Sequence, residues 1–177
     1  MSRNHISELS SADGTIYKGI DQLKVSAEAH FQNLFSEAGE DCEEIISDYL
    51  TNIPLLVNKE DNVALMKAFS EEEISKVIWS MEPDKAPGPD GFSIHFYRAC
   101  WEIIKVDLLR MIKAFQLKAK VGGSTNSTFL ALIPKDVNPS SFGGFRPISL
   151  CNASYKILAK LMANRIKSLL GKRISPT

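Results

Sequence analysis

Residues 70–91 read SEEEISKVIWSMEPDKAPGPDG, a run in which a helix must give way to a loop. Ser70 and the three glutamates after it predict a helix start, because a serine hydroxyl can accept hydrogen bonds from first-turn amides and Glu73 stands at the reciprocal position of a capping box. Apolar side chains then recur at helical spacing, and Pro83 requires the helix to end before it. The predicted buried residues are Ile74, Val77, Ile78 and Met81.

The rest of this run, Lys85-Ala86-Pro87-Gly88-Pro89-Asp90-Gly91, predicts a loop of defined shape. Two prolines and two glycines within five residues are incompatible with a helix or a central strand. The prolines fix φ, Gly91 can take a positive φ, and the Asp90 carboxylate can bind nearby backbone amides. An ordinary linker is the alternative, but an amphipathic helix is predicted to follow at once, which favours a shaped loop.

Downstream of this loop the sequence predicts a long helix, a hairpin and a final helix. The long helix spans residues 93–119 with a kink near Trp101, and most of its aromatic side chains are predicted to lie in the core. Two short strands, residues 128–134 and 145–150, flank a loop rich in Asn, Pro, Ser and Gly, which is typical of a hairpin. The final helix spans residues 153–170 and is predicted to expose a basic face. That face consists of Lys156, Lys160, Arg165 and Lys167.

The N-terminal third predicts a smaller, acidic part of the chain. Asp13-Gly14 favours a tight turn and predicts a hairpin over residues 6–17. Residues 21–35 repeat apolar side chains at helical spacing, with Asp21 as the predicted N-cap and the last turn included in the buried stripe. The acids within residues 37–44 predict a solvated linker, with a metal-binding cluster as the alternative.

Charge is distributed unevenly along the chain, although the net charge is zero. Residues 1–85 hold 7 Lys and Arg against 17 Asp and Glu, a net −10, whereas residues 86–177 hold 14 against 4, a net +10. A basic half of this kind is typical of proteins that bind polyanions. The alternatives are that the two oppositely charged halves pack together or that the charges face solvent.

Composition excludes several classes of protein. With 177 residues, 44% of them hydrophobic, the chain has enough apolar residues for a globular core, which excludes a disordered chain and a disulfide-rich miniprotein. No apolar run reaches the roughly 18 residues of a membrane span, and the N-terminus lacks the apolar segment of a signal peptide. Cys42, Cys100 and Cys151 are odd in number and far apart, which predicts reduced thiols in an intracellular protein of the cytoplasm or nucleus.

The residue types predict anion binding and give no support for catalysis. The histidines have no carboxylate at a diagnostic spacing, no P-loop or dinucleotide fingerprint occurs, and the four acids of the basic half form no paired-carboxylate motif. The predicted hairpin is the candidate anion site, because Lys135 follows its first strand and Arg146 opens its second. If the two pair across the hairpin, an ammonium and a planar guanidinium converge on one phosphate. Two separate surface cations at a turn are the alternative.

In order and spacing, these motifs resemble the reverse transcriptases of plant LINE-type (non-LTR) retrotransposons. The resemblance covers most of the chain, and its N-terminal part resembles the connector that follows the endonuclease in those polyproteins. The motifs that carry it are Lys85-Ala86-Pro87-Gly88-Pro89-Asp90-Gly91, Phe96-Tyr97 with Trp101, Ala131-Leu132-Ile133-Pro134-Lys135, Phe145-Arg146-Pro147-Ile148-Ser149-Leu150 and Tyr155-Lys156-Ile157-Leu158-Ala159-Lys160.

The resemblance implies an α+β, mostly helical fold with short β-hairpins, the fingers part of an incomplete right-hand polymerase. It implies an acidic connector over residues 1–60 and a partial reverse transcriptase domain over residues 61–177, which holds the fingers and the start of the palm. Lys135 and Arg146 match the residues that contact the phosphates of the incoming nucleoside triphosphate in that family. The Lys85–Gly91 loop matches a motif near the template path, with its aspartate in a structural role.

The family's metal-binding aspartates lie on palm strands beyond the final helix predicted here. The resemblance therefore implies no catalytic residue, metal ligand or cofactor in this chain, and we expect magnesium only in the complete polymerase. The implied partners are RNA or DNA, a nucleoside triphosphate, and the missing palm and thumb. We also expect an exposed apolar patch on the final helix, with marginal stability or self-association. The patch would consist of Leu158, Leu161, Met162, Leu169 and Leu170.

Two other functions agree with the same residues. Residues 86–177 would serve as a non-catalytic nucleic-acid-binding module, in which case affinity falls steeply with salt. The chain would also serve as a helical interaction protein whose basic half binds an acidic partner, its own N-terminal half included.

Overall fold

The computed structural model describes residues 6–11, 14–36, 46–47, 50–51 and 57–173, with side chains up to Leu170. The acidic run at residues 37–44 and its alternative metal cluster lie outside the described residues, as do Asp13 and Cys42.

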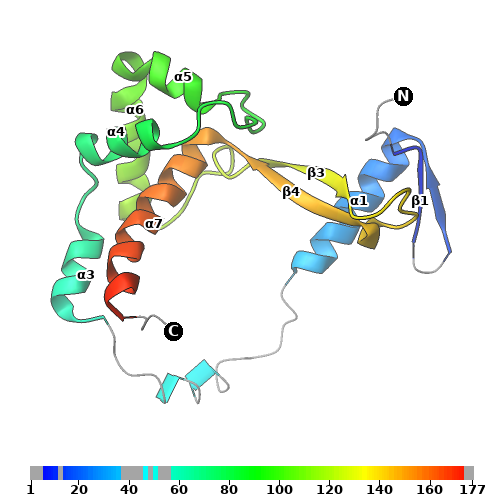
Figure 1. Cartoon of the computed structure of the whole chain (residues 1–177), viewed down its shortest axis with the longest axis horizontal. Coiled ribbons are helices and arrows are strands. Elements are labelled where there is room, and N and C mark those ends of the chain that lie inside the picture. Colours follow the sequence, from blue (N-terminus) through cyan, green and yellow to red (C-terminus); the bar gives the residue numbers. More distant parts are fainter. Residues whose placement is uncertain (1–5, 12–13, 37–45, 48–49, 52–56, 174–177) are drawn as a thin grey trace. The chain divides into compact units, whose positions relative to one another are not determined.

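The chain divides into two compact units (Figure 1). Residues 1–52 with 130–148 form the N-terminal unit, and residues 53–129 with 149–177 form the helical unit. This division differs from the predicted boundary at residue 60, because the outer part of the hairpin in the basic half supplies core residues to the N-terminal unit.

The N-terminal unit begins with a small antiparallel hairpin. β1 (Glu8–Ser10) pairs with β2 (Ile16–Lys18), which confirms the predicted hairpin, and Gly14 takes a φ of 87° in the turn between them. α1 (Ile20–Phe35) follows directly. This order places one apolar face of α1 against the hairpin.

A second hairpin completes the core of this unit. β3 (Thr128–Pro134) and β4 (Phe145–Cys151) form a two-stranded sheet, as the sequence predicts, and a short 3-10 helix (Phe142–Gly144) precedes β4. Aromatic side chains from this region pack against α1 and β1. The buried residues of the core are Leu9, Phe31, Phe142 and Phe145.

Two expectations for α1 are wrong. Gly19, not Asp21, is the N-cap residue, and no side chain caps this helix start. Leu34 and Phe35 are exposed, because among the residues of α1 only Phe31 is fully buried and the last turn extends past the core.

The helical unit contains the remaining helices. They are α3 (Lys59–Met66), α4 (Glu71–Ser80), α5 (Ile94–Ala99), α6 (Trp101–Lys118) and α7 (Ala153–Arg173). α4 lies beside both α5 and α7, and α3 also contacts α7 (Figure 1). The break between α5 and α6 confirms the predicted kink. Helices predominate and the described strands form two hairpins, but the assignment to polymerase fingers stays a prediction.

Most of the expectations for α4 are confirmed. The Ser70 hydroxyl accepts a hydrogen bond from the Glu73 amide at 3.1 Å, and the predicted apolar side chains lie in or against the core. The reciprocal half of the capping box is absent, because the Glu73 carboxylate binds Arg165 of α7 instead. The start of α4 is thereby connected to a helix about ninety residues away in the sequence.

The predicted apolar patch on α7 is largely wrong. Leu158 and Leu161 are fully buried and Met162 packs against the same core, because α4, α5 and α6 supply apolar partners within the chain. Leu169 is partly buried, and Leu170 is exposed. The first half of α7 is therefore a core element of the helical unit.

α3 begins with a complete capping box that sequence reasoning missed. The Asn58 side chain accepts from the Asp61 amide at 2.7 Å, and the Asp61 carboxylate accepts from the Asn58 amide at 3.2 Å. We predict that Asn58→Ala destabilises this helix start by about 1 kcal/mol. Hydrogen exchange of the α3 amides measures the effect. Asn62→Ala, on the exposed side of the same helix, is the control and is expected to leave α3 unchanged or slightly more stable.

Candidate functional site

The Lys85–Gly91 loop, which we call the proline loop, is docked on the start of α7. Gly88 is buried, and a Cβ atom at this position would lie 2.4 Å from the Asn152 nitrogen and 2.5 Å from the Cys151 carbonyl carbon. The Gly91 amide donates to the Gly88 carbonyl at 3.0 Å, and Gly91 takes a φ of 74°. The close approach and the turn explain why this loop carries glycines.

Asn152 connects the proline loop to a second segment. Its side chain is buried, with the residue only 3% exposed, and its Oδ1 accepts from the Asp90 amide at 3.1 Å. Its Nδ2 donates to the Ser124 carbonyl at 2.8 Å and to the Thr125 carbonyl at 3.4 Å. One buried amide therefore holds two loops that lie more than thirty residues apart in the sequence.

The Asp90 carboxylate is hydrogen-bonded within its own loop. Its Oδ1 accepts from the Phe92 amide at 3.0 Å, which fixes the exit of the loop. Nearby, burial raises the pKa of the Tyr97 hydroxyl above its ordinary value, and a hydrogen bond with Ser154 partly opposes that rise. Tyr97 is therefore neutral at physiological pH and packs as part of the core.

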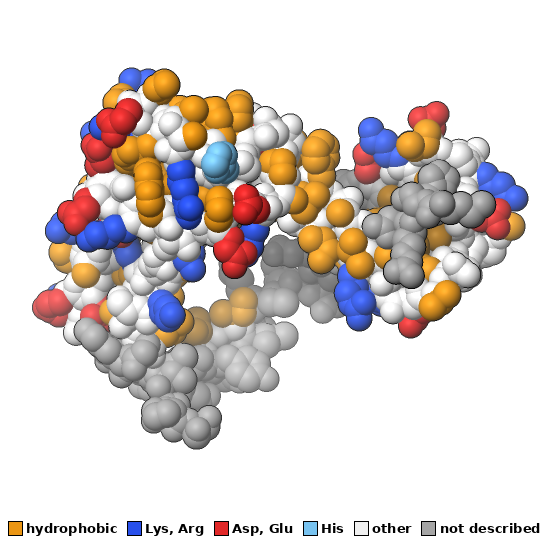
Figure 2. Space-filling view, turned by 45° about the horizontal axis from the view of Figure 1, so that its top comes forward, with side chains coloured by type: hydrophobic (Ala, Val, Ile, Leu, Met, Phe, Trp, Pro, Cys, Tyr) orange, Lys and Arg blue, Asp and Glu red, His pale blue; other side chains and the backbone are white. Residues whose placement is uncertain are grey.

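Lysine side chains gather where the proline loop meets α7. The Lys156 ammonium donates to the Ala86 carbonyl at 2.9 Å. Lys156, Lys85 and Lys160 line one pocket of about 270 Å³ together with Phe92 and Pro87. Figure 2 shows Lys and Arg side chains set among exposed hydrophobic side chains on a face of the helical unit. The site thus combines positive charge with apolar surface.

Lys135 directly follows β3, and Arg146 is the second residue of β4. In β4, Phe145 is buried and Pro147 is partly buried, whereas Arg146 between them is exposed. In β3, Ile133 is exposed, and Lys135, which lies beyond the last strand residue, is exposed as well. Both cations are therefore at the surface of the same hairpin, and their convergence on one phosphate stays a prediction.

The Lys135 ammonium is hydrogen-bonded within its own hairpin. It donates to the Gly143 carbonyl at 2.8 Å, and the Lys135 amide donates to the Gly144 carbonyl at 2.8 Å. An ammonium has three donors, so this contact leaves donors for a ligand. The contact holds the lysine at the loop between the strands.

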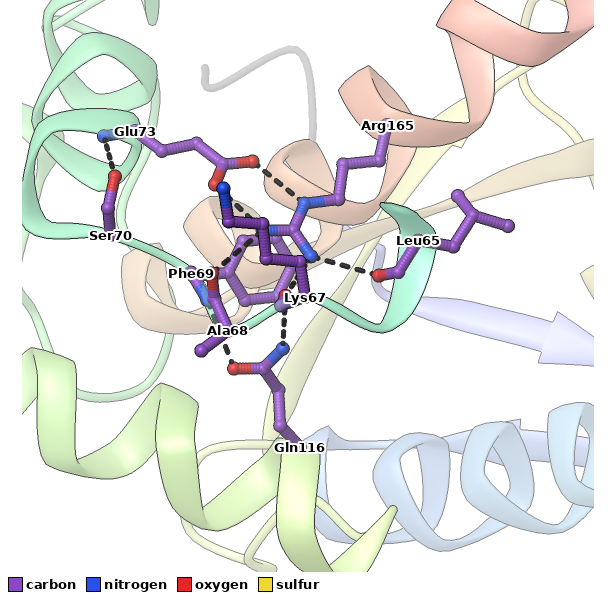
Figure 3. Close-up of polar contacts among 8 residues, drawn as sticks. All are labelled: Leu65, Lys67, Ala68, Phe69, Ser70, Glu73, Gln116 and Arg165. Carbon is purple, nitrogen blue, oxygen red and sulfur yellow. Dashed lines mark hydrogen bonds and ion pairs between the residues drawn. The ribbon is translucent and has the colours of Figure 1, made fainter. Parts of the chain in front are cut away.

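The structure corrects the predicted basic face on α7. Arg165 is not exposed: its side chain is only 13% accessible and its guanidinium pairs with the Glu73 carboxylate at 2.8 Å. It also donates to the carbonyls of Leu65, Lys67 and Ala68. Figure 3 shows these contacts converging on the segment between α3 and α4. Arg165 is a structural residue, because its donors are used within the chain.

The remaining members of that face differ in their environment. Lys160 and Lys167 are exposed, and Lys156 is partly buried against the proline loop. A role for these three lysines in nucleic-acid contact stays a prediction.

Sequence reasoning missed the residues that hold the loops. Arg98 of α5 donates to the Ile78 carbonyl at 3.3 Å and the Trp79 carbonyl at 2.9 Å, and also to the Met81 carbonyl, so that it caps the end of α4. Asn152 carries a signal, an asparagine directly before a predicted helix, but this signal does not reveal its distant partners.

Two further features bear on the kind of site that is present. Among the described residues, no group of three or more His, Cys, Asp or Glu side chains is placed so that it could hold a metal ion. In the same part of the chain, none of the helices combines the length and the apolar character that a membrane crossing requires.

Comparison with known proteins gives one relevant similarity. No family model matches the chain. Over 177 residues, the chain is 29% identical to the "Transposon TX1 uncharacterized 149 kDa protein" of Xenopus laevis. The match covers 98% of this chain and 13% of that protein, so the chain spans about an eighth of the length of this curated relative. The similarity supports a transposable-element origin for the chain.

Proposed function

We propose that the chain is the fingers part of a retrotransposon reverse transcriptase. The second hairpin contacts the phosphates of an incoming nucleoside triphosphate through Lys135 and Arg146, and the proline loop lies on the template side. In this proposal the catalytic aspartates belong to another part of the parent enzyme, and among the described residues no group of acids is placed to hold a metal ion.

One observation carries this proposal. The proline loop bears the resemblance, and the junction of β4 with α7 lies between two more of the segments that bear it, more than fifty residues away in the sequence. In the structure Gly88 packs directly on Cys151 and Asn152, and Asp90 is hydrogen-bonded to the Asn152 side chain. Because the proline loop packs on the junction between two other segments of the resemblance, this arrangement supports a common function for them. The similarity to a transposon protein along nearly the whole chain supports the same proposal.

Photolabelling with an azido-substituted deoxynucleoside triphosphate tests the proposal. We predict that the label attaches within residues 128–151 and that unlabelled triphosphate competes for it. Lys135→Ala combined with Arg146→Ala should reduce labelling at least about tenfold, because a charged hydrogen bond to phosphate contributes about 1.5–3 kcal/mol. Peptide mapping by mass spectrometry locates the label.

The matched control removes two exposed cations elsewhere, Lys24→Ala combined with Lys113→Ala. This pair should leave the labelling unchanged. If both double variants reduce labelling equally, the nucleotide responds only to net charge and the assignment of Lys135 and Arg146 is wrong.

A further inference from the structure

The pocket beside the proline loop is separate in its residues from the hairpin cations. It lies wholly within the helical unit and holds about 270 Å³. Its lining comes from the end of α4, the proline loop, the start of α5 and the first two turns of α7. Three elements and a loop held by hydrogen bonds therefore shape it before any ligand arrives.

Two lysines of the pocket, Lys156 and Lys160, have no acidic partner among the residues that line it. The pocket contains one acidic side chain, Glu82, and its carboxylate pairs with Lys85 at 3.3 Å. Lys156 and Lys160 are four residues apart on α7 and so project from the same helix face. Lys156 donates one hydrogen bond to Ala86, which leaves two of its three donors for a ligand. The positive charge in the pocket is thus concentrated at α7.

An aromatic ring forms another part of the lining. Phe92 is 44% exposed although it lies in the pocket, and it stacks on Phe96 with ring centroids 4.4 Å apart. The Phe92 ring is therefore supported by a stacking contact within the chain. An exposed, supported ring beside two ammonium groups is the combination that binds a nucleotide by base stacking and phosphate contact.

We propose that this pocket takes one nucleotide of a single-stranded nucleic acid, with its phosphate at Lys156 and Lys160 and its base stacked on Phe92. The inference rests on the proposed function for its class of ligand and adds the site and the binding mode. A single strand is specified because base faces in a duplex are covered by their neighbours, so a duplex offers the pocket phosphates only. A phosphopeptide would find two ammonium groups here and no bidentate guanidinium fork.

Fluorescence anisotropy with the full chain and a labelled oligothymidylate of about twelve nucleotides tests the inference, with the matching oligouridylate beside it. We predict that Lys160→Gln weakens binding about fivefold at 0.1 M salt and lowers the steepness of the log–log salt dependence by about 0.7, the effect of one lost phosphate contact on a single strand. Phe92→Leu should weaken binding by about fivefold or more while leaving the salt dependence unchanged.

Matched variants outside the pocket are the controls. Lys113→Gln removes an exposed lysine from α6, and Phe129→Leu removes a ring that is 58% exposed on β3. Neither should change binding by more than about twofold. A duplex of the same length should bind at least about tenfold more weakly than the single strand.

Three results would overturn the inference. Equal binding of duplex and single strand would show that no base stacks on Phe92. Equal effects of Phe92→Leu and Phe129→Leu would show the same. Full competition by inorganic phosphate or a phosphopeptide at the concentration of the oligonucleotide would show a simple anion site. In each case the proposed function still stands if the photolabel attaches to the second hairpin. Conversely, if the hairpin is not labelled while the pocket binds single strands as predicted, the proposed function fails and this inference stands.

Discussion

Arg165→Ala is expected to lower the free energy of unfolding of the helical unit by about 3 kcal/mol. The substitution leaves the Glu73 carboxylate without its partner and removes donors from three backbone carbonyls. It also removes the guanidinium that stacks on the Phe69 ring at 3.7 Å. Breaking a buried ion pair costs about 3–5 kcal/mol, and the partial exposure of Glu73 places the expected value at the lower end.

Urea denaturation followed by tryptophan fluorescence measures this effect selectively, because both tryptophans of the chain, Trp79 and Trp101, lie in the helical unit. Arg165→Lys keeps the charge but lacks the planar guanidinium. It should therefore recover less than half of the free energy of unfolding that Arg165→Ala loses. Lys167→Ala, an exposed change on the same helix, should stay within about 0.5 kcal/mol of the parent. A loss below about 1 kcal/mol for Arg165→Ala would show that water replaces the guanidinium at little cost.

Gly88→Ala is expected to lower the same free energy by about 3 kcal/mol. The added methyl group would lie 2.4 Å from both the nitrogen and Oδ1 of Asn152, a distance at which the backbone must move. Overpacking costs about 1–3 kcal/mol, and displacement of the proline loop also removes the hydrogen bonds of Asp90 and Lys156 to this junction.

Gly123→Ala is the matched control, because nothing lies within 4 Å of a Cβ at that position and its φ is not positive. It should be neutral or slightly stabilising through the unfolded state. The same fluorescence measurement applies to both variants. Equal stability of the two would mean that the proline loop is not closely packed on α7 in solution.

Local signals in the sequence predicted most of the elements. Helical spacing and the serine before three glutamates predicted α4, Pro83 set a limit to its end, and the break at Cys100 lies beside the kink predicted near Trp101. The hairpins followed from apolar runs flanked by turn residues. These signals work because the interactions that form a helix start or a turn join residues only a few positions apart.

The contacts between elements were not predictable in the same way. Arg165 and Lys156 both looked like solvent-facing cations of an amphipathic helix, since their spacing on α7 does not tell an exposed cation from one that binds a distant carbonyl. The burial of Leu158 and Leu161 was not predicted, for a related reason. The sequence does not specify which helices will cover an apolar face.

The two candidate sites also differ in whether local sequence signals could predict them. Strand and turn signals placed Lys135 and Arg146 at one hairpin, and their convergence on one anion stays a prediction. The pocket lined by Lys85, Lys156 and Phe92 required the structure, because its parts are brought together by Asn152 and Gly88 from segments far apart in the chain.

The side chains of four residues have one property in common: each donates hydrogen bonds to main-chain carbonyls in or beside a segment that connects two elements. These residues are Arg165, Arg98, Asn152 and Lys156. Substitutions of exposed side chains in those connections should therefore leave the path of the main chain unchanged. Gly88 is an exception, because its close approach to Asn152 leaves no space for a larger residue.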